Sequence, residues 1–255
     1  MRISVWTGAT SFPFEHQLTN GHLARHNVYV RGEGQPILIL QELPGIGPDT
    51  FALADRLIAA GFKVYLPHLL GKLGKASKLT SLTNAVRILC VRHTFQMFRV
   101  GAQSDMAAWM RALCAEISDR EGGARLGVVG MCLTGSFAIP LMAEDAVLGA
   151  VASQPALPVR HSTYLHMSQA DVVAANAAMD KKGPALAMRY GTDTLSRPEH
   201  ITALKAAFGG NLETETFDNP EEGDRSMKHS LLTLDFSEAA YARLEHYFKA
   251  RFGMG

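Results

Sequence analysis

One stretch of the chain decides the fold: residues 125–139, which read RLGVVGMCLTGSFAI. Its first part, Arg125–Gly130, is a mainly apolar run of the length of a buried strand. Cys132 follows after one residue, and Leu133–Ala143 then has the composition of a helix that begins at once. A strand that turns sharply into a helix is the local structure that presents a nucleophile at the edge of a sheet.

The same stretch has the form G-x-Nu-x-G of a nucleophile elbow, with cysteine in place of the more familiar serine. The neighbours two residues away have to be small, because strand and helix approach each other closely there. Gly130 meets this demand, whereas position 134 is Thr and the glycine comes one residue later, at Gly135. Backbone N–H groups at the start of a helix favour a thiolate. We therefore expect Cys132 to act as a nucleophile and the Leu133 N–H to be an oxyanion donor.

Outside this stretch, short apolar runs alternate with longer amphipathic segments, which predicts an α/β protein with a mostly parallel sheet flanked by helices. We expect one domain over residues 1–255, because no linker rich in Pro, Gly or Ser divides the chain. The first two strands read as an antiparallel hairpin, and Asp49 as a helix N-cap. The seven predicted strands are 27–31, 36–41, 62–66, 125–130, 147–153, 185–190 and 212–217. The six predicted helices are 49–60, 100–117, 133–143, 169–181, 198–208 and 237–252.

The charge balance and the cysteines exclude several classes of function. Lys plus Arg number 25 and Asp plus Glu 24, so the net charge is +1 and nucleic acid is not an expected partner. The three cysteines, Cys90, Cys114 and Cys132, are far apart and fit neither a disulfide framework nor a zinc or redox C-x-x-C site. We expect no metal and no cofactor.

The hydrophobic residues are abundant but scattered along the chain. They make up 47% of the residues, against 19% charged, which is enough for a sizeable core. No apolar run has the length of a signal-peptide core or of a membrane span. The sequence therefore predicts no membrane partner and a cytoplasmic location, where free thiols stay reduced.

Three short motifs together resemble the dienelactone hydrolase family of the α/β-hydrolase fold. GMCLTG at 130–135 resembles the family's cysteine elbow. LILQELPGI at 38–46 resembles its strand followed by a Glu and an oxyanion-hole loop, and AGFKVYLPHL at 60–69 has its order of helix, Gly, aromatic residue, strand and Pro. The resemblance covers about residues 25–252 in the same order. It implies an α/β-hydrolase fold.

An elbow nucleophile needs a base and an acid to orient that base, and in this fold the chain order is nucleophile, acid, histidine. Asp193 lies just beyond the predicted strand that ends near Tyr190, so we assign it as the acid. His229 follows the last predicted strand and its polar loop, and we assign it as the base. His200 and His246 fall within predicted helices and fit this role poorly.

Glu42 is an unusual residue, because it directly follows a wholly apolar strand. In the resembled family the matching Glu hydrogen-bonds the resting cysteine and takes part in activating it on substrate binding. The alternative is an ordinary carboxylate that faces water at the end of a strand. The next residue, Leu43, begins a Pro-Gly loop, and its N–H is our candidate for the second oxyanion donor.

Three departures from the family pattern concern substrate binding. Family members that cleave dienelactones hold the substrate carboxylate with two arginines, and Lys72 and Thr233 stand at the matching positions. Lysine is not a bidentate substitute for arginine and threonine is uncharged, so carboxylate recognition of this kind is in doubt. His68 replaces an Asp that often follows the strand-end Pro. Lys72 and His68 are candidate substrate contacts, although His68 also fits a structural role.

The segment 68–103 is a long excursion between predicted elements, and it mixes basic with apolar residues. It suits a lid or cap over the site. A partner-binding or dimer face and an ordinary solvated helix are the alternatives. The sequence does not define the oligomeric state.

The function that these residues indicate is hydrolysis of a small-molecule ester or lactone through an acyl-cysteine intermediate, with a Cys-His-Asp triad. One alternative is a cysteine enzyme of the DJ-1 or glutamine-amidotransferase type, which also places Cys on a strand-to-helix turn. Another is a hydrolase-fold protein that has lost catalysis and binds a small molecule or a partner. Reactivity of the Cys132 thiol separates the last alternative from the two enzymes.

Overall fold

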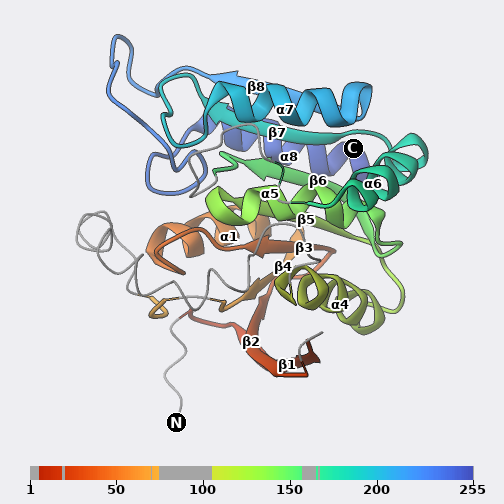
Figure 1. The fold of residues 1–255 in the computed structure, drawn as a ribbon. Helices are drawn as coiled ribbons and strands as arrows, with labels where there is room; N and C mark the ends of the chain where they lie inside the picture. The colour runs from red at the N-terminus through yellow and green to blue at the C-terminus, as the bar shows by residue number, and fades with distance from the viewer. Residues whose placement is uncertain are drawn as a thin grey trace.

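The structure of the protein is a computed structural model, which describes residues 6–18, 21–69, 71–74, 105–156, 165 and 167–254. In these residues one eight-stranded sheet has the order β1-β2-β4-β3-β5-β6-β7-β8 (Figure 1). β2 is antiparallel to both of its neighbours, and all other neighbours are parallel. The strands are β1 (Thr10–Gln17), β2 (Leu23–Arg31), β3 (Gln35–Leu40), β4 (Phe62–Pro67), β5 (Leu126–Met131), β6 (Val147–Ser153), β7 (Ala185–Tyr190) and β8 (Leu212–Phe217). The predicted α/β class with a mostly parallel sheet is confirmed.

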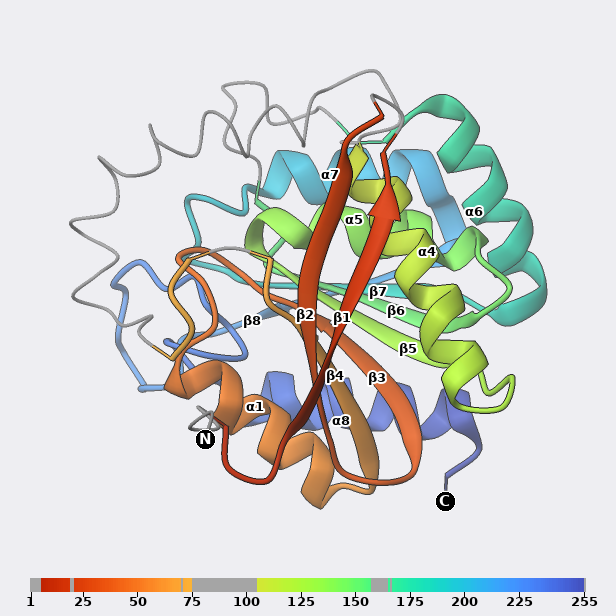
Figure 2. The same cartoon turned by 90° about the horizontal axis from the view of Figure 1, so that it is seen from below.

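Helices cover both faces of the sheet (Figure 2). One face carries α1 (Pro48–Ala59) and α8 (Glu238–Phe252). The other carries α4 (Asp105–Arg120), α5 (Gly135–Ala138), α6 (Gln169–Lys182) and α7 (Pro198–Phe208). Short 3-10 turns lie at Cys132–Thr134, Ile139–Ala143 and Gly209–Asn211. None of the helices in the described part of the chain is long and apolar enough to cross a membrane.

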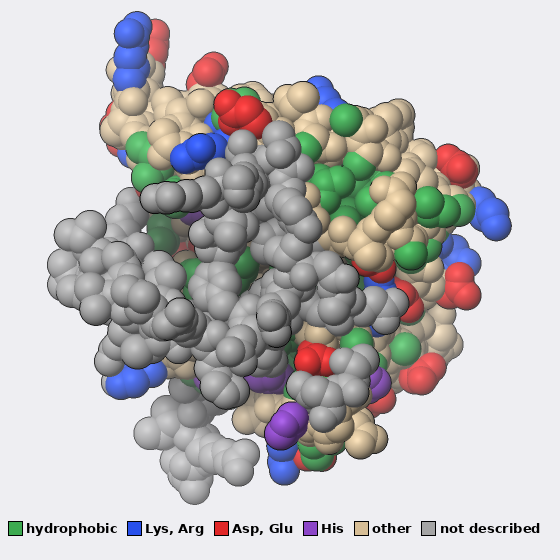
Figure 3. Space-filling model, viewed as in Figure 1, with side chains coloured by type: hydrophobic (Ala, Val, Ile, Leu, Met, Phe, Trp, Pro, Cys, Tyr) green, Lys and Arg blue, Asp and Glu red, His purple; other side chains and the backbone are tan. Residues whose placement is uncertain are grey.

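The core lies in two layers because side chains of a strand alternate between the faces of a sheet. Along β3, Ile37 and Ile39 pack into the layer under α1 and α8, and Leu38 and Leu40 pack into the opposite layer. On the outer surface shown in Figure 3, the described Lys and Arg side chains are interspersed with Asp and Glu. This mixture agrees with the small net charge.

The predicted hairpin of the first two strands is wrong. β2 does not pair with β3, because β4 lies between them: Val30 of β2 faces Tyr65 of β4, and Tyr65 in turn faces Leu38 of β3. The reason is burial. β3 and β4 are buried along nearly their whole length, which requires the interior of a sheet covered on both faces, whereas β2 is partly exposed.

The edge strand β1 is absent from the sequence prediction. It pairs antiparallel with β2, and its residues alternate between exposed and half-buried. Pro13 lies within it, and proline has no N–H for the ladder, so it is tolerated mainly at an edge. This interrupted pattern is why the segment does not read as a strand.

Two helix predictions also need correction. The N-cap of α1 is Gly47 and not Asp49, with Pro48 in the first turn and the Gly47 N–H donating to Thr50 Oγ1 at 3.3 Å. The helix predicted at 133–143 is only one short α-helical turn between two 3-10 turns, because Pro140 lacks the N–H that a regular helix requires. For the helix predicted at 100–117, residues 100–104 lie outside the described residues.

The parallel strands bring several loops to one edge of the sheet. The carboxyl ends of β3, β5, β6 and β7 lie side by side, and polar residues follow each of them. In open α/β sheets this edge is the usual place for a binding site. The loops that follow these strands carry Glu42, Cys132, Gln154 and Asp193.

Candidate active site

Cys132 occupies a strained turn at the end of β5. Its φ is +54°, in the left-handed region that residues other than glycine seldom adopt. A Cβ at Gly130 would lie 2.4 Å from the Thr134 carbonyl oxygen, so the close approach of the turn to the strand requires glycine there. Cys132 itself is half-buried. The geometry is that of a nucleophile elbow, which presents the side chain beyond the edge of the sheet.

Thr134 stands where an elbow usually has glycine, and the structure explains why threonine fits. Its fully buried Oγ1 accepts from the Met131 N–H and lies within donating distance of the Leu40 carbonyl, both at 3.0 Å. The hydroxyl therefore ties the end of β5 to the end of β3. The position that has to be glycine is the next one, Gly135, because a Cβ there would lie 2.9 Å from Pro155 Cα.

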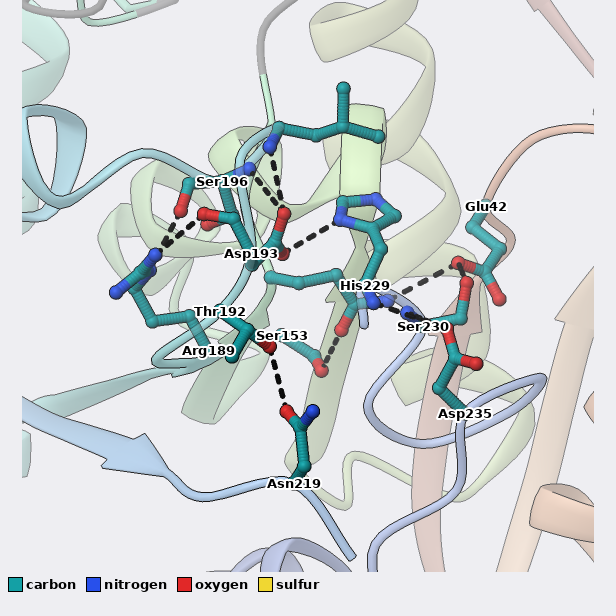
Figure 4. A network of polar contacts seen from close by, with 12 residues as sticks. Glu42, Ser153, Arg189, Thr192, Asp193, Ser196, Asn219, His229, Ser230 and Asp235 are labelled. Carbon is teal, nitrogen blue, oxygen red and sulfur yellow. Dashed lines mark hydrogen bonds and ion pairs between the residues drawn. The ribbon is translucent and has the colours of Figure 1, made fainter. Parts of the chain in front are cut away.

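Asp193 and His229 come together although they are far apart in the sequence. His229 Nδ1 lies 2.7 Å from Asp193 Oδ2, and since a carboxylate only accepts, Nδ1–H is the donor (Figure 4). The other carboxylate oxygen accepts from the N–H groups of Leu195 and Ser196 at 2.8 and 2.9 Å. These bonds fix both the acid and the orientation of the imidazole ring.

The second ring nitrogen of His229 is the basic atom that remains. Nε2 is buried and makes no hydrogen bond of normal geometry with a side chain in the described ranges. Burial disfavours the charged ring, but the hydrogen bond to Asp193 and the neighbouring Cys132 thiol outweigh it and raise the pKa of His229. Catalytic hydrogen bonds are often long or poorly aligned before substrate binds. The structure thus brings His229 next to both Asp193 and Cys132.

Two residues that the sequence analysis missed hold the acid and base loops. Arg189, at the end of β7, is buried and donates to the carbonyls of Asp193 at 2.7 Å and Ser196 at 2.6 Å. Asn219 accepts from Thr192 Oγ1 at 2.7 Å, which joins the loop after β7 to the loop after β8 (Figure 4). An arginine inside the otherwise apolar strand ALAMRY is the signal that could have identified Arg189.

Glu42 is buried and does not face water, and the hydrogen bond expected between it and the resting cysteine is absent among the described residues. Its carboxylate instead accepts from Thr233 Oγ1, from Ser230 Oγ at 2.9 Å and from Gln154 Nε2 at 3.2 Å. Burial raises the pKa of Glu42, although the three donors and the charge of His229 oppose that rise. Glu42 therefore belongs to the surroundings of the base.

The two candidate oxyanion donors occupy equivalent positions after neighbouring strands. Leu40 of β3 pairs with Gly130 of β5, and Leu43 and Leu133 each lie three residues beyond this pair. Leu133 is in the first turn after the elbow, where an N–H has no intrahelical acceptor. The N–H of Leu43 has no hydrogen-bond acceptor in the described part of the chain.

The candidate substrate contacts are less closely connected to the triad. His68 Nε2 lies 3.0 Å from the Gly71 carbonyl, so that nitrogen is used within its own loop. Lys72 is exposed and makes no hydrogen bond or ion pair with any described residue. Most of the predicted lid at 68–103, from residue 75 onwards, lies outside the described residues, as does Cys90. No group of three or more His, Cys, Asp and Glu side chains in the described ranges is placed to hold a metal ion.

The sheet order and the elbow define a protein of the α/β-hydrolase fold. Residues 26–205 match the family model described as the dienelactone hydrolase family, which is well over half of the chain. The chain therefore belongs to the dienelactone hydrolase family, as its motifs predict. No curated protein matches its sequence.

Solved structures agree on the fold. A Klebsiella pneumoniae protein provisionally described as a dienelactone hydrolase aligns with a TM-score of 0.60 at 17% identity, over 98% of this chain and 100% of that one. An esterase of Pyrococcus furiosus aligns with a TM-score of 0.58 at 15% identity, over 94% and 92% of the two chains. A dienelactone hydrolase-like promiscuous phosphotriesterase from metagenomic libraries gives 0.58 at 15% identity, over 96% and 98%. This chain is a hydrolase-family protein with the fold that these structures share.

Proposed function

We propose that the protein hydrolyses a small-molecule ester or lactone through an acyl-cysteine intermediate. The observation that carries the proposal is the alignment of His229 between Asp193 and the elbow cysteine: Nδ1 is taken by the carboxylate, and Nε2 remains available on the side of Cys132. A positioned base next to a thiol is the arrangement that activates a cysteine nucleophile.

At the start of the first half of the reaction, His229 Nε2 already holds the proton of the Cys132 thiol, because the pKa of His229 is raised, and the sulfur attacks the substrate carbonyl carbon. The N–H groups of Leu43 and Leu133 donate to the oxyanion that forms. As the tetrahedral intermediate collapses, the carbon–oxygen bond to the leaving group breaks, and His229 gives its proton to the departing oxygen. The product of this half is a thioester on Cys132.

In the second half, water attacks the thioester carbonyl while His229 accepts one proton of that water. The carbon–sulfur bond breaks, the acid product leaves, and the proton remains on His229 beside the Cys132 thiolate. Asp193 keeps the ring in the required tautomer. Glu42, whose charge interacts favourably with His229, supports the imidazolium that forms in each half.

The surroundings of Glu42 support an uncharged acyl group rather than a carboxylate-bearing one. Thr233, which stands where an arginine would bind a substrate carboxylate, donates to Glu42 instead. Lys72 and His68 remain candidate substrate contacts. We further propose a reducing, cytoplasmic setting, because Cys132 has to remain a free thiol to act.

The test combines thiol labelling with turnover. Native protein is treated with iodoacetamide near pH 7, the label is located by mass spectrometry, and hydrolysis of 4-nitrophenyl acetate and of an uncharged lactone is followed in the same samples. Selective labelling of Cys132 that stops turnover in proportion supports the proposal. Slow, unselective labelling together with no turnover contradicts it and favours a binding protein.

A further inference from the structure

Gln154, the residue directly after β6, has an unusual backbone. Its φ is +35°, and among the described residues only Cys132 shares a positive φ without being glycine. Its N–H donates to the Met188 carbonyl at 2.7 Å, and the residue is fully buried. Strained backbone persists where surrounding contacts hold it, and it gathers at functional sites.

The side chain of Gln154 is paired at both ends. Its Oε1 accepts from Ser153 Oγ, and its Nε2 donates to Glu42 Oε2 at 3.2 Å. The bond from Ser153 sets which end of the amide faces Glu42, since a hydroxyl that donates requires an oxygen opposite it. The amide therefore presents a donor to the buried carboxylate.

Glu42 also accepts a hydrogen bond from the loop that carries His229, so it links Gln154 to that loop. The same carboxylate oxygen, Oε2, accepts from Ser230 Oγ at 2.9 Å, and Ser230 is the neighbour of His229 in the sequence (Figure 4). The N–H groups of His229 and Ser230 share an acceptor, Asp235 Oδ2, at 3.1 and 3.3 Å. Glu42 thus holds the side chain of Ser230, and Asp235 holds the backbone next to it that carries the imidazole.

The segment that follows Gln154 also touches the nucleophile. The Ala156 N–H donates to the Cys132 carbonyl at 3.1 Å, and Pro155 packs where only glycine fits at position 135. The turn after β6 therefore contacts the elbow through its backbone, and through the side chain of Gln154 it contacts Glu42, which in turn accepts from Ser230 of the base loop.

We propose that Gln154 is a positioning residue that acts through Glu42 to hold His229 in line with Cys132, an inference that rests on the proposed function. It touches neither the substrate nor a reacting atom. Its role is to keep the carboxylate of Glu42 directed at the base loop. Because the alignment of base and nucleophile matters mainly once the substrate is bound, its loss should lower kcat more than it changes KM.

Two substitutions separate the side-chain bond from the backbone strain. Gln154→Asn suits a positive φ better than Gln does, but its amide is one methylene too short to reach Glu42. Gln154→Met keeps the length and loses the donor. Thr50→Val is the matched control, since it removes a buried side-chain hydrogen bond from the Gly47 N–H at the start of α1, and that bond involves neither Gln154, Glu42 nor the loop that carries His229. Each is compared with wild type by turnover of 4-nitrophenyl acetate and by the rate at which iodoacetamide alkylates Cys132.

We expect both Gln154 variants to lose about tenfold in kcat with KM changed less than about twofold, and to alkylate more slowly at Cys132. In a Glu42→Gln background the Gln154→Met change should add nothing further, because the two residues act in series. Wild-type kcat in Gln154→Asn, losses no larger than those of Thr50→Val, or independent effects in the double variant would overturn the inference alone. A wild-type protein that neither hydrolyses the ester nor reacts at Cys132 would overturn the proposed function, and this inference with it.

Discussion

The chain contains two described cysteines in opposite environments. Cys114 lies in the middle of α4, fully buried among apolar side chains, and burial together with the charge of Glu144 raises the pKa of its thiol. Cys132 lies half-exposed on a strained turn, with the imidazole of His229 beside it. The residue type is the same, and only the backbone position and the neighbours differ. A cysteine is therefore assigned a chemical role from its place in the fold, not from its presence in the sequence.

The largest expected effect comes from removing the thiol of Cys132. Cys132→Ala should lower kcat/KM for 4-nitrophenyl acetate at least about a thousandfold, because no other described side chain replaces the nucleophile. The fold should survive, since the half-buried thiol contributes little packing. Circular dichroism and thermal unfolding provide the check that the variant is folded. Activity that persists in folded Cys132→Ala would refute the assignment.

The next-largest effect is expected from changing His229, the proposed base, which lies beside Cys132 and not beside Cys114. Because the pKa of His229 is raised, its ring stays positively charged around neutrality and favours the thiolate of its neighbour. Wild-type Cys132 should therefore react with iodoacetamide faster at pH 7 than Cys132 of His229→Gln does. Equal rates in the two proteins would contradict the assignment of His229 as the base. Cys114 should stay unlabelled in both proteins until they are unfolded.

The same raised pKa makes a prediction about stability with a definite sign. A group whose pKa is higher in the folded than in the unfolded state stabilises the fold below its unfolded value, about 6.5 for histidine, and loses that contribution as pH rises. The free energy of unfolding of the wild type relative to His229→Gln should therefore decrease from pH 7 to pH 10. Urea unfolding at several pH values measures it, and a difference that grows with pH would be contrary to the raised pKa.

The two cysteines also show how far sequence reasoning reaches. The elbow was predictable because its signal is local: an apolar strand, Gly130, a cysteine and an immediate helix. Asp193 and His229 followed from their order along the chain and their positions after strands, and the structure brings them within 2.7 Å of each other. Local pattern was sufficient for these positions because parallel strands deliver their loops to one edge.

Contacts between segments that are distant in the sequence could not be predicted from the sequence pattern. The insertion of β4 between β2 and β3 depends on which strands need burial on both faces, which a hairpin reading of adjacent segments overlooks. The bonds of Glu42 to Gln154 and Ser230 join residues 112 and 188 positions apart, with no spacing that would reveal them. Sequence pattern therefore located the elbow and its cysteine but not the polar contacts around His229.

A smaller effect is expected where a buried acid supports the base. Burial raises the pKa of Glu42, so its contribution to stability is present at low pH and lost as pH rises. Glu42→Gln should raise the free energy of unfolding by about 1 kcal/mol at pH 8 and by progressively less toward pH 4, as the carboxyl of the unfolded chain becomes protonated as well. It should also lower kcat about tenfold. Urea unfolding at the two pH values, with kcat measured in parallel, tests whether the variant gains stability and loses activity. A Glu42→Gln protein that is less stable than wild type at pH 8 would contradict this prediction.

The smallest effect is expected from substitution of the buried cysteine, Cys114. Cys114→Ala removes one sulfur from a filled core, which should cost about 1 kcal/mol of unfolding free energy because the site can relax only in part. The kcat and the Cys132 alkylation rate should match wild type, since Cys114 takes part in none of the hydrogen bonds that hold Asp193, His229 and Glu42. Cys114→Ser changes the size less but leaves a hydroxyl among apolar side chains, so it should destabilise the fold more than Ala does. If either variant slowed catalysis without unfolding, the distinction between a structural and a reactive cysteine would fail in this protein.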